Sequence, residues 1–340
     1  MDQPTDRSLP DVAVVVIGRN EGERLRRCLA SVLQVNYPRE LLQVIYVDSH
    51  STDDSLQLAQ GMGIRTVALD GPTTPARGRN AGWRAAEASF ILFLDGDTIV
   101  DPEFLRRALP EMTDPKVAGV CGDRREMSAD DSVYNAVFDF DWRACYGTVD
   151  YFGGDALVRM EALRAVDGYS ESLIAGEEPE MCWRMRHRGY SILQIQAPMT
   201  QHDLAMRSFR QYWWRSVRTG WAYANVSSLY AATDDPLWLR ESQHIIAHAA
   251  FWSGLILCAI AVSIWKGSLL ACLLALLVVI AQCLRPALRV RARAKLLWHA
   301  IAYGVHSEFQ HFPILWGHMR YWKHKRWKQP ATIIDYKSQL

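Results

Sequence analysis

Two carboxylates separated by one glycine, Asp95-Gly96-Asp97, carry the clearest chemical signal in the sequence. They directly follow an apolar run, residues 90–94, which is long enough for a buried strand and short for an ordinary helix. Open α/β sheets bind ligands at the carboxyl ends of their strands, where these side chains would stand. Carboxylates suit Mg²⁺ or Mn²⁺, with a substrate's phosphates completing the coordination. An acidic turn before the next helix would use the same residues, so the motif alone leaves both interpretations open.

A second group of carboxylates lies at the start of a later expected helix, Glu177-Glu178-Pro179-Glu180. Three carboxylates therefore gather at this helix start, where they could form part of a site. Acidic residues also stabilise a helix start by complementing its dipole, which is the alternative explanation. His202 follows a strand expected at residues 190–195.

The elements that must position these groups alternate between strand and helix. Apolar strands are expected at residues 12–17, 43–47, 66–69 and 90–94, with amphipathic helices between them. This order predicts an α/β fold with a doubly wound, mostly parallel sheet and right-handed crossovers. A strand at residues 117–121 would extend the sheet. Because no G-x-G-x-x-G follows the first strand, a dinucleotide-binding oxidoreductase is disfavoured.

The middle of the chain is less regular. Residues 122–147 are polar and aromatic without periodicity, and we expect a loop region that closes over the site. Residues 151–159 suggest a strand in which Gly153-Gly154 allows a ligand or another backbone to approach closely.

Two uncharged segments, residues 245–265 and 268–284, are joined by Lys266-Gly267 and predict a tight transmembrane hairpin. A buried helical hairpin of a soluble protein is the alternative. Basic residues follow at once and favour a cytosolic side by the positive-inside rule. They are Arg285, Arg289, Arg291, Arg293 and Lys295.

The C-terminal region after the hairpin is expected at the membrane surface. Residues 296–317 are apolar but interrupted by histidines, Glu308 and Pro313, so they should lie in the interface rather than span it. Residues 319–328 mix basic and aromatic side chains, which suits anionic lipid headgroups, or else a solvated basic tail.

Composition sets further bounds. The net charge of +1 gives no reason to expect a nucleic-acid partner. The seven cysteines form no C-x-x-C pair, and we interpret them as reduced and structural in a chain that faces the cytosol. The first residues lack a basic segment followed by an apolar one, so no cleavable signal peptide is expected.

Taken in order, the motifs make the sequence resemble the membrane-anchored, bacterial type of family-2 glycosyltransferase, which has a GT-A fold. The resemblance covers about residues 10–230 by motif and the rest by architecture. Each motif alone is weak, whereas their order and intervals together are specific. The matching elements are Val14-Val-Val-Ile-Gly-Arg-Asn20-Glu21, Val47-Asp48-Ser49-His50-Ser51-Thr52-Asp53, Arg77-Gly-Arg79-Asn80-Ala-Gly82, Asp95-Gly96-Asp97, Gly153-Gly154, Val166-Asp167-Gly168-Tyr169 and Glu177-Glu178-Pro179-Glu180.

The resemblance implies a set of site residues. Nucleotide-sugar contacts would come from Asn20, Glu21, Asp48, Arg77, Asn80 and Asp95. Asp95, Asp97 and His202 would be the metal ligands, with Asp97 the more direct of the two carboxylates. A structural histidine is the alternative for His202. Glu178 stands where the family has its catalytic base, usually an aspartate, and Glu177 is a rival. The acceptor side would involve Gly153, Gly154, Gln211, Trp214 and Arg215.

The activity implied is inverting, Mn²⁺- or Mg²⁺-dependent sugar transfer from a UDP- or GDP-sugar to a lipid or lipid-linked glycan. A cytosolic catalytic domain, residues 1–230, would precede a membrane region, residues 231–340, in a multi-pass protein of the inner (plasma) membrane. Three alternatives remain: a processive polysaccharide synthase, a sugar-nucleotide nucleotidyltransferase-like enzyme, and a non-catalytic membrane scaffold. Processive synthases have the motif Gln-x-x-Arg-Trp, whereas this sequence has Gln211-Tyr-Trp-Trp-Arg215. This difference disfavours a processive polysaccharide synthase.

Overall fold

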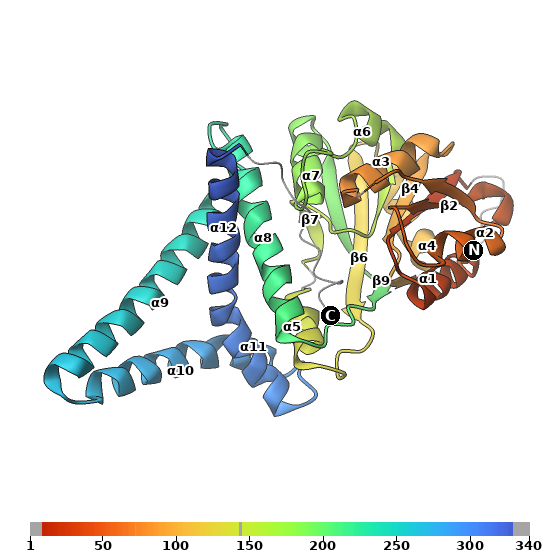
Figure 1. The fold of residues 1–340 in the computed structure, drawn as a ribbon. Helices are drawn as coiled ribbons and strands as arrows, with labels where there is room; N and C mark the ends of the chain where they lie inside the picture. Colours follow the sequence, from red (N-terminus) through yellow and green to blue (C-terminus); the bar gives the residue numbers. More distant parts are fainter. Residues whose placement is uncertain (1–8, 72, 143–144, 329–340) are drawn as a thin grey trace. The chain divides into compact units, whose positions relative to one another are not determined.

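The structure is a computed structural model that describes residues 9–71, 73–142 and 145–328 (Figure 1). The chain divides into two compact units. The sheet unit comprises Met1–Met127 and Trp142–Leu204, and the helical unit comprises Ser128–Asp141 and Ala205–Leu340. By compactness, residues 205–230 belong with the C-terminal helices. The boundary expected after residue 230, between a catalytic and a membrane region, stays a prediction about function.

The first half of the sheet unit has the expected architecture. Strands β3, β2, β1 and β4 lie side by side in this order and are parallel. The interleaved helices cover them, and α1 is amphipathic as expected, since its Leu25, Cys28, Leu29 and Val32 are buried. The elements are β1 (Val12–Gly18), α1 (Glu23–Leu33), β2 (Leu42–Asp48), α2 (Ser55–Gly61), β3 (Arg65–Ala68), α3 (Pro75–Ala85) and β4 (Phe90–Asp95).

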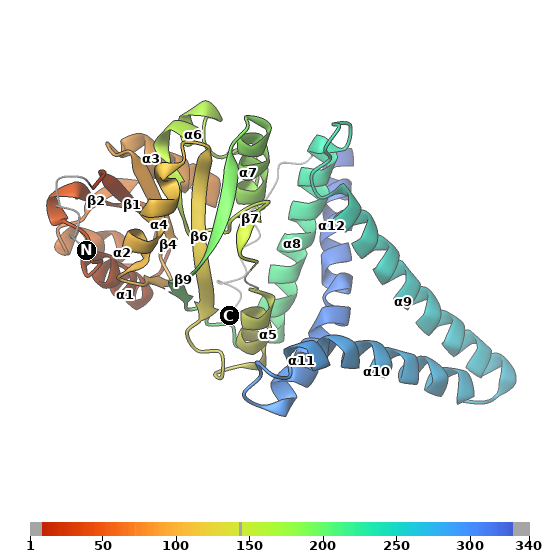
Figure 2. The same ribbon diagram turned by 180° about the vertical axis from the view of Figure 1, so that it is seen from behind.

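The second half of the sheet is mixed. The order continues β4-β8-β6-β9-β5, where β8 is antiparallel to both neighbours. Strand β6 is parallel to β9, and the two lie side by side in Figures 1 and 2. The sheet is therefore parallel-rich, with antiparallel strands at the side that carries His202. Its elements are β5 (Thr98–Val100), α4 (Phe104–Ala108), β6 (Val117–Glu126), β7 (Gly147–Val149), β8 (Ala156–Arg159), α6 (Met160–Ala165), α7 (Glu177–His187) and β9 (Ser191–His202).

The expectation of a loop over residues 122–147 is wrong for most of that segment. Strand β6 continues to Glu126 because it pairs with β9 along this stretch, and that pairing outweighs a polar local sequence. Residues Val133–Asp141 form helix α5, whose Ala136, Val137 and Phe138 are buried. Strand β9 likewise runs seven residues beyond the expected end at 195, so His202 is its last residue. Residues 143–144 lie outside the described part.

In the helical unit, two glycines let helices α8 and α12 pack closely along each other (Figures 1 and 2). A Cβ atom on Gly220 would lie 1.9 Å from the carbonyl oxygen of Ile314, and one on Gly317 would lie 2.2 Å from that of Val217. Such backbone approach needs residues without side chains. The helices are α5, α8 (Phe209–Tyr230), α9 (Leu239–Lys266), α10 (Leu270–Val290), α11 (Leu297–Phe309) and α12 (His311–Arg326).

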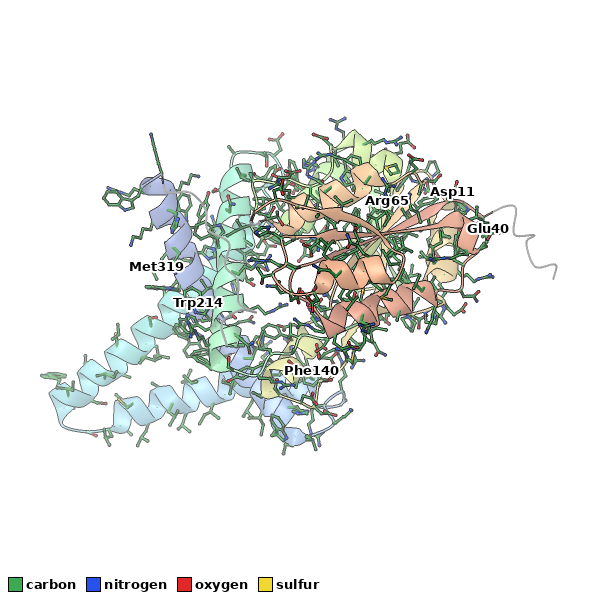
Figure 3. All side chains as sticks on the ribbon, turned by 45° about the vertical axis from the view of Figure 1, so that its right-hand side comes forward. Asp11, Glu40, Arg65, Phe140, Trp214 and Met319 are labelled. Carbon is green, nitrogen blue, oxygen red and sulfur yellow. The ribbon has the colours of Figure 1, made fainter. Side chains whose placement is uncertain are left out.

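Helices α9 and α10 are long and apolar enough to cross a membrane, with mean hydropathies of 2.2 and 2.1 over their most apolar windows. Only 17% and 11% of those windows are buried, and their side chains stand away from the helix pair in Figure 3. A buried hairpin of a soluble core therefore does not describe them. Gly267 makes the tight turn between them with a φ of 59°. Residues 296–317 form α11 and the first part of α12 rather than one segment.

Candidate active site

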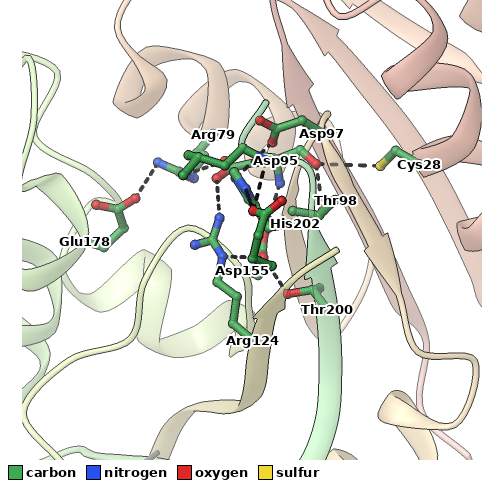
Figure 4. A network of polar contacts seen from close by, with 12 residues as sticks. Cys28, Arg79, Asp95, Asp97, Thr98, Arg124, Asp155, Glu178, Thr200 and His202 are labelled. Atoms are coloured by element: carbon green, nitrogen blue, oxygen red, sulfur yellow. Dashed lines mark hydrogen bonds and ion pairs between the residues drawn. The ribbon is translucent and has the colours of Figure 1, made fainter. Parts of the chain in front are cut away.

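Asp95, Asp97 and His202 come together at one edge of the sheet unit (Figure 4). Asp95 ends β4, and Asp97 follows two residues later. Strand β5 pairs with β9 so that Thr98 lies opposite His202, which brings the imidazole beside Asp97. One ligand atom from each of the three residues lies within 4.8 Å of the others, and Nε2 of His202 is 3.3 Å from Oδ1 of Asp97.

The chemistry of this trio fits a divalent cation. Two carboxylates suit Mg²⁺ or Mn²⁺, and an imidazole nitrogen is a common ligand of first-row transition metals. Burial lowers the pKa of His202, which keeps the ring in the neutral form that can coordinate. The predicted metal ligands are thus placed together, and their role stays a prediction.

A buried arginine, Arg79, connects this trio to the second group of carboxylates. Its Nη2 lies 2.9 Å from Oδ1 of Asp95, and its Nη1 lies 3.0 Å from one oxygen each of Glu177 and Glu178. The Arg79 side chain is 2% exposed, so these charges meet with little solvent between them. Carboxylates from β4 and from the start of α7 are therefore held in one network (Figure 4).

The network sets the protonation of its members. Burial alone would raise the pKa of Asp95, but the guanidinium groups of Arg79 and Arg124 hold it below the ordinary value. Burial and the neighbouring Glu177 raise the pKa of Glu178 to about 7 despite Arg79. Asp95 is thus kept as a carboxylate ligand, whereas Glu178 has a pKa near that of an efficient base at neutral pH.

Asp155 holds the backbone of the Asp95-Gly96-Asp97 motif by a hydrogen bond. Its Oδ1 accepts a hydrogen bond from the backbone N–H of Asp95 at 3.1 Å, and Oδ2 accepts one from the hydroxyl of Thr200 at 2.8 Å. Nη2 of Arg124 lies 3.6 Å from Oδ2 of Asp95, and Nε lies 3.7 Å from Asp155. A Cβ atom on Gly154 would lie 2.5 Å from Oδ2 of Asp95, so glycine is needed there. Gly154 therefore has a structural explanation besides the predicted acceptor role.

Three of the residues predicted to contact the nucleotide sugar, Asn20, Glu21 and Asp48, lie at the ends of β1 and β2. Oδ1 of Asp48 accepts a hydrogen bond from the Tyr46 hydroxyl and Oδ2 accepts one from the backbone of Ser51, each at 2.9 Å. Oδ1 of Asn20 accepts one from the backbone of Thr52 at 2.7 Å. Glu21, nearby, is buried. These contacts join the two turns that follow β1 and β2 into one edge.

Helix α3 contributes two further predicted nucleotide contacts with different surroundings. Arg77 is exposed near the helix start, and its Nη1 donates to the carbonyl of Asp70 at 3.4 Å. Asn80 is buried, and its amide bonds both backbone polar groups of Tyr169. Asn80 thus has a structural role, since it holds the turn at Tyr169. A contact between Asn80 and a nucleotide stays a prediction.

Three of the predicted acceptor-side residues belong to the helical unit. Gln211 caps helix α8, where its Oε1 accepts the backbone N–H of Ser208 at 3.1 Å. The guanidinium of Arg320 lies over the ring of Trp214, and that of Arg215 lies over Phe138. Gly153 is in the sheet unit, where a Cβ atom would be 3.6 Å from Nη1 of Arg124. The acceptor role of these four residues stays a prediction.

The structure adds four polar residues to the site, and none of them has a role predicted from the sequence. Arg79 lies two positions after Arg77 in the same element, and Asp155 directly follows Gly153-Gly154, so their neighbours were the available signal. Arg124 and Glu126 lie at the end of β6, in the segment expected to be a loop. No local sequence pattern marks these two residues, and only the pairing of β6 with β9 places them at the site.

Family comparisons agree with the geometry. Residues 13–165 match the model described as glycosyl transferase family 2, and residues 90–288 match glycosyl transferase family group 2. The second match covers more than half of the chain. Both matched ranges include the Asp95-Gly96-Asp97 motif.

Two curated relatives are longer than this chain. Over 218 residues it is 29% identical to a pre-mycofactocin glycosyltransferase of Mycobacterium tuberculosis, covering 59% of this chain and 44% of the relative. Over 241 residues it is 24% identical to the probable glycosyltransferase YdaM of Bacillus subtilis, covering 64% and 56%. The chain thus spans about half the length of these relatives.

The fold is also found among solved structures. The mannosyltransferase PcManGT from Pyrobaculum calidifontis, in complex with GDP-Man and Mn²⁺, superposes with a TM-score of 0.62 at 20% identity. The superposition covers 89% of this chain and 88% of that one. It places the chain in the GT-A fold.

Proposed function

Because the chain belongs to the family 2 glycosyltransferases, we propose that it transfers a sugar from a nucleoside diphosphate sugar to a membrane acceptor, with inversion at the anomeric carbon. The acceptor that we propose is a lipid or lipid-linked glycan at the cytosolic face of the membrane. The donor would be a UDP- or GDP-sugar, and transfer would depend on Mn²⁺ or Mg²⁺.

The observation that carries this proposal is the buried network around Arg79. One end of it holds Asp95 of the candidate metal site, and the other holds Glu177 and Glu178. An inverting transfer needs a group that stabilises the leaving diphosphate and a single base for the acceptor hydroxyl. The network contains a candidate for each kind of group in one buried cluster, and the proposed reaction requires no second nucleophile.

Glu178 is the better candidate for the base. The side chain of Glu178 is 15% exposed, whereas that of Glu177 is only 3% exposed, so an acceptor can reach Glu178 more readily. The raised pKa of Glu178, about 7, also suits proton abstraction near neutral pH. Glu177 would then serve to hold Arg79 and to raise the pKa of its neighbour.

In the proposed reaction, Glu178 accepts the proton of the acceptor hydroxyl as that oxygen attacks the anomeric carbon. The bond between this carbon and the oxygen of the β-phosphate breaks, and the nucleoside diphosphate leaves on the opposite side. Asp95, Asp97 and His202 would hold a divalent ion, which supplies positive charge for the departing diphosphate. Arg79 keeps Asp95 ionised and fixes the direction of Glu178.

A donor screen tests this function. The full chain in detergent is incubated with UDP- and GDP-sugars and Mn²⁺, and both hydrolysis of the donor and thermal protection are measured. We expect one sugar nucleotide to be hydrolysed slowly and to raise the unfolding temperature in the presence of Mn²⁺. If no sugar nucleotide binds, or if binding and turnover persist unchanged in excess chelator, the proposal fails.

The membrane part of the proposal rests on α9 and α10. Both helices expose apolar side chains along lengths sufficient for a bilayer, and the basic residues after α10 favour a cytosolic end. In this arrangement Gly267 lies outside the cell and the sheet unit lies in the cytosol. The basic and aromatic part of α12, up to Arg326, would meet anionic headgroups.

Cysteine labelling tests this topology in cells. In a chain with exposed Cys145 and Cys258 replaced by serine, single cysteines are introduced at Gly267 or at Glu40 on the sheet unit (Figure 3). A membrane-impermeant maleimide should label the first and reach the second only after lysis. Labelling at Glu40 in intact cells would overturn the cytosolic placement, and release by alkaline carbonate would exclude the hairpin as an anchor.

A further inference from the structure

We propose that Glu126 is a positioning residue that holds His202 in the tautomer and orientation required for binding a divalent ion. The inference rests on the metal role of His202 in the proposed function and extends it to a residue outside the ligand trio. Glu126 is the last residue of β6, and the register of the sheet pairs it directly with His202, the last residue of β9.

The geometry places the imidazole between two carboxylates. Oε2 of Glu126 lies 4.0 Å from Nδ1 of His202, and Oδ1 of Asp97 lies 3.3 Å from Nε2 on the other side of the ring. The side chains of all three residues are buried. Nδ1 is itself buried and has no hydrogen-bond partner among the described residues. Glu126 is therefore the carboxylate in place to stabilise a proton on Nδ1.

Glu126 is also fixed to the turn that follows His202. Its Oε2 accepts the backbone N–H of Leu204 at 3.1 Å. The backbone N–H of Met127 donates to the carbonyl of His202 at 2.9 Å, and that of Asp203 donates to the carbonyl of Asp97 at 2.9 Å. The carboxylate and the ring therefore move together with one rigid segment, as a positioning role requires.

The chemistry follows from the single N–H of a neutral imidazole. If the proton is on Nε2, it points at Asp97 and that nitrogen cannot bind a metal. If the proton is on Nδ1, Nε2 has a free lone pair on the side of the ring where Asp97 lies, and this nitrogen can bind a metal ion. A carboxylate close to Nδ1 stabilises the second tautomer, which is the arrangement that metal-bound histidines usually show.

The test is a Mn²⁺ titration of the full chain in detergent, followed by the EPR signal of free Mn²⁺. Glu126→Gln keeps the shape and an acceptor for Leu204 but loses the charge, so Mn²⁺ should bind about tenfold more weakly, and up to about 100-fold more weakly in Glu126→Ala. In a His202→Ala background, Glu126→Gln should cause no further loss. Equal losses in both backgrounds, or no loss in either, would overturn the inference.

A matched control separates positioning of the ring from loosening of the turn. Asp203, next to His202, forms an ion pair with Arg27 that anchors the same turn. Asp203→Asn should leave Mn²⁺ affinity within about twofold of wild type, and an equal loss there would overturn the role of Glu126. A wild-type chain that binds no Mn²⁺ would overturn the metal role and this inference together, whereas the other outcomes concern Glu126 alone.

Discussion

The sheet unit and the helical unit distribute apolar and polar residues in opposite ways. In the sheet unit, strands such as Val12–Gly18 are buried on both faces, and charged groups are gathered at one edge around Arg79. In the helical unit, leucines and isoleucines of α9 and α10 are exposed, while His299, His306 and His318 are buried. The second pattern is the one expected if an apolar solvent surrounds α9 and α10, as the proposed membrane location requires.

The difference also concerns what holds each unit together. The sheet unit rests on large apolar side chains beneath an ionic network. The helical unit joins α8 to α12 by close glycine contacts, and polar side chains pair between other helices, such as His306 with Tyr212 and Asp141. Small residues and side-chain hydrogen bonds are the usual means of packing helices in a membrane. Perturbations should therefore act on catalysis in one unit and on packing in the other.

The largest effect is expected from removing one negative charge at the candidate metal site. Asp97→Asn should lower turnover on the order of 10³-fold, because several kcal/mol of charge stabilisation at the leaving group are lost. The fold should persist, as judged by circular dichroism and thermal unfolding. Asp70→Asn, on the surface of the same unit, is the matched control and should leave turnover unchanged. Full activity of Asp97→Asn would remove the metal from the mechanism.

The next effect concerns the base. Glu178→Gln should lower turnover by about 10² or more while the affinity for the sugar nucleotide changes little, since general-base catalysis contributes about this factor. Glu177→Gln should cost less turnover, because Glu177 is more deeply buried and Glu178 would remain. If steady-state kinetics show the reverse order, the base is Glu177.

The pH dependence of turnover gives an independent check on Glu178. Its pKa is raised to about 7, so the carboxylate form needed in a base is lost as pH falls through 7. Turnover should therefore fall about tenfold per pH unit below 7, and this limb should vanish in Glu178→Gln. The same shift means that the folded chain binds this proton more tightly than the unfolded chain. The contribution of Glu178 to stability is thus fully present below the pKa that this residue has in the unfolded chain, and it is lost as pH rises through about 7.

In the helical unit, the comparison predicts an effect on stability. Gly220→Ala would place a Cβ atom 1.9 Å from the carbonyl oxygen of Ile314, so α8 and α12 must separate, at a cost of about 1–3 kcal/mol. Gly254→Ala in α9 is the matched control, since a Cβ atom there meets nothing within 4 Å. The unfolding temperature in detergent should fall only for Gly220→Ala. Equal behaviour of the two would mean that α8 and α12 are not in close contact.

The sequence was informative where a local pattern and the fold agree. The strands at residues 12–17 and 90–94 have continuous apolar runs, and the structure confirms them because parallel strands are buried on both faces. The ligand trio was predicted through the motifs, and the structure brings its members together. Residues that depend on distant pairing were missed. Glu126 is placed by β9, and nothing in its local sequence marks it as part of a strand.

Arg79 shows a second limit of the same kind. Its neighbour Arg77 was assigned to the nucleotide, yet Arg77 is exposed and Arg79 is the cation buried among the carboxylates. Both lie on one helix two positions apart, and which of them faces the sheet depends on where α3 begins. The sequence fixes that start only to within a residue or two. Helix α5 was missed because its buried face packs within the helical unit, and the polar sequence around it masked its short apolar run.

The smallest effect is expected for an exposed ion pair in the helical unit. Lys295 and Asp130 lie 2.7 Å apart, but their side chains are 76% and 50% exposed, in contrast to the 2% and 3% of Arg79 and Glu177. Water and salt screen such a pair, so Lys295→Gln should change the free energy of unfolding by at most about 1 kcal/mol. The variant also keeps four of the five basic residues that favour the cytosolic end of α10, so its topology should not change. Thermal unfolding at low and high salt measures the first effect, and labelling at Gly267 measures the second. A loss as large as that of Gly220→Ala would mean that this pair is shielded from water, as the arginine network of the sheet unit is.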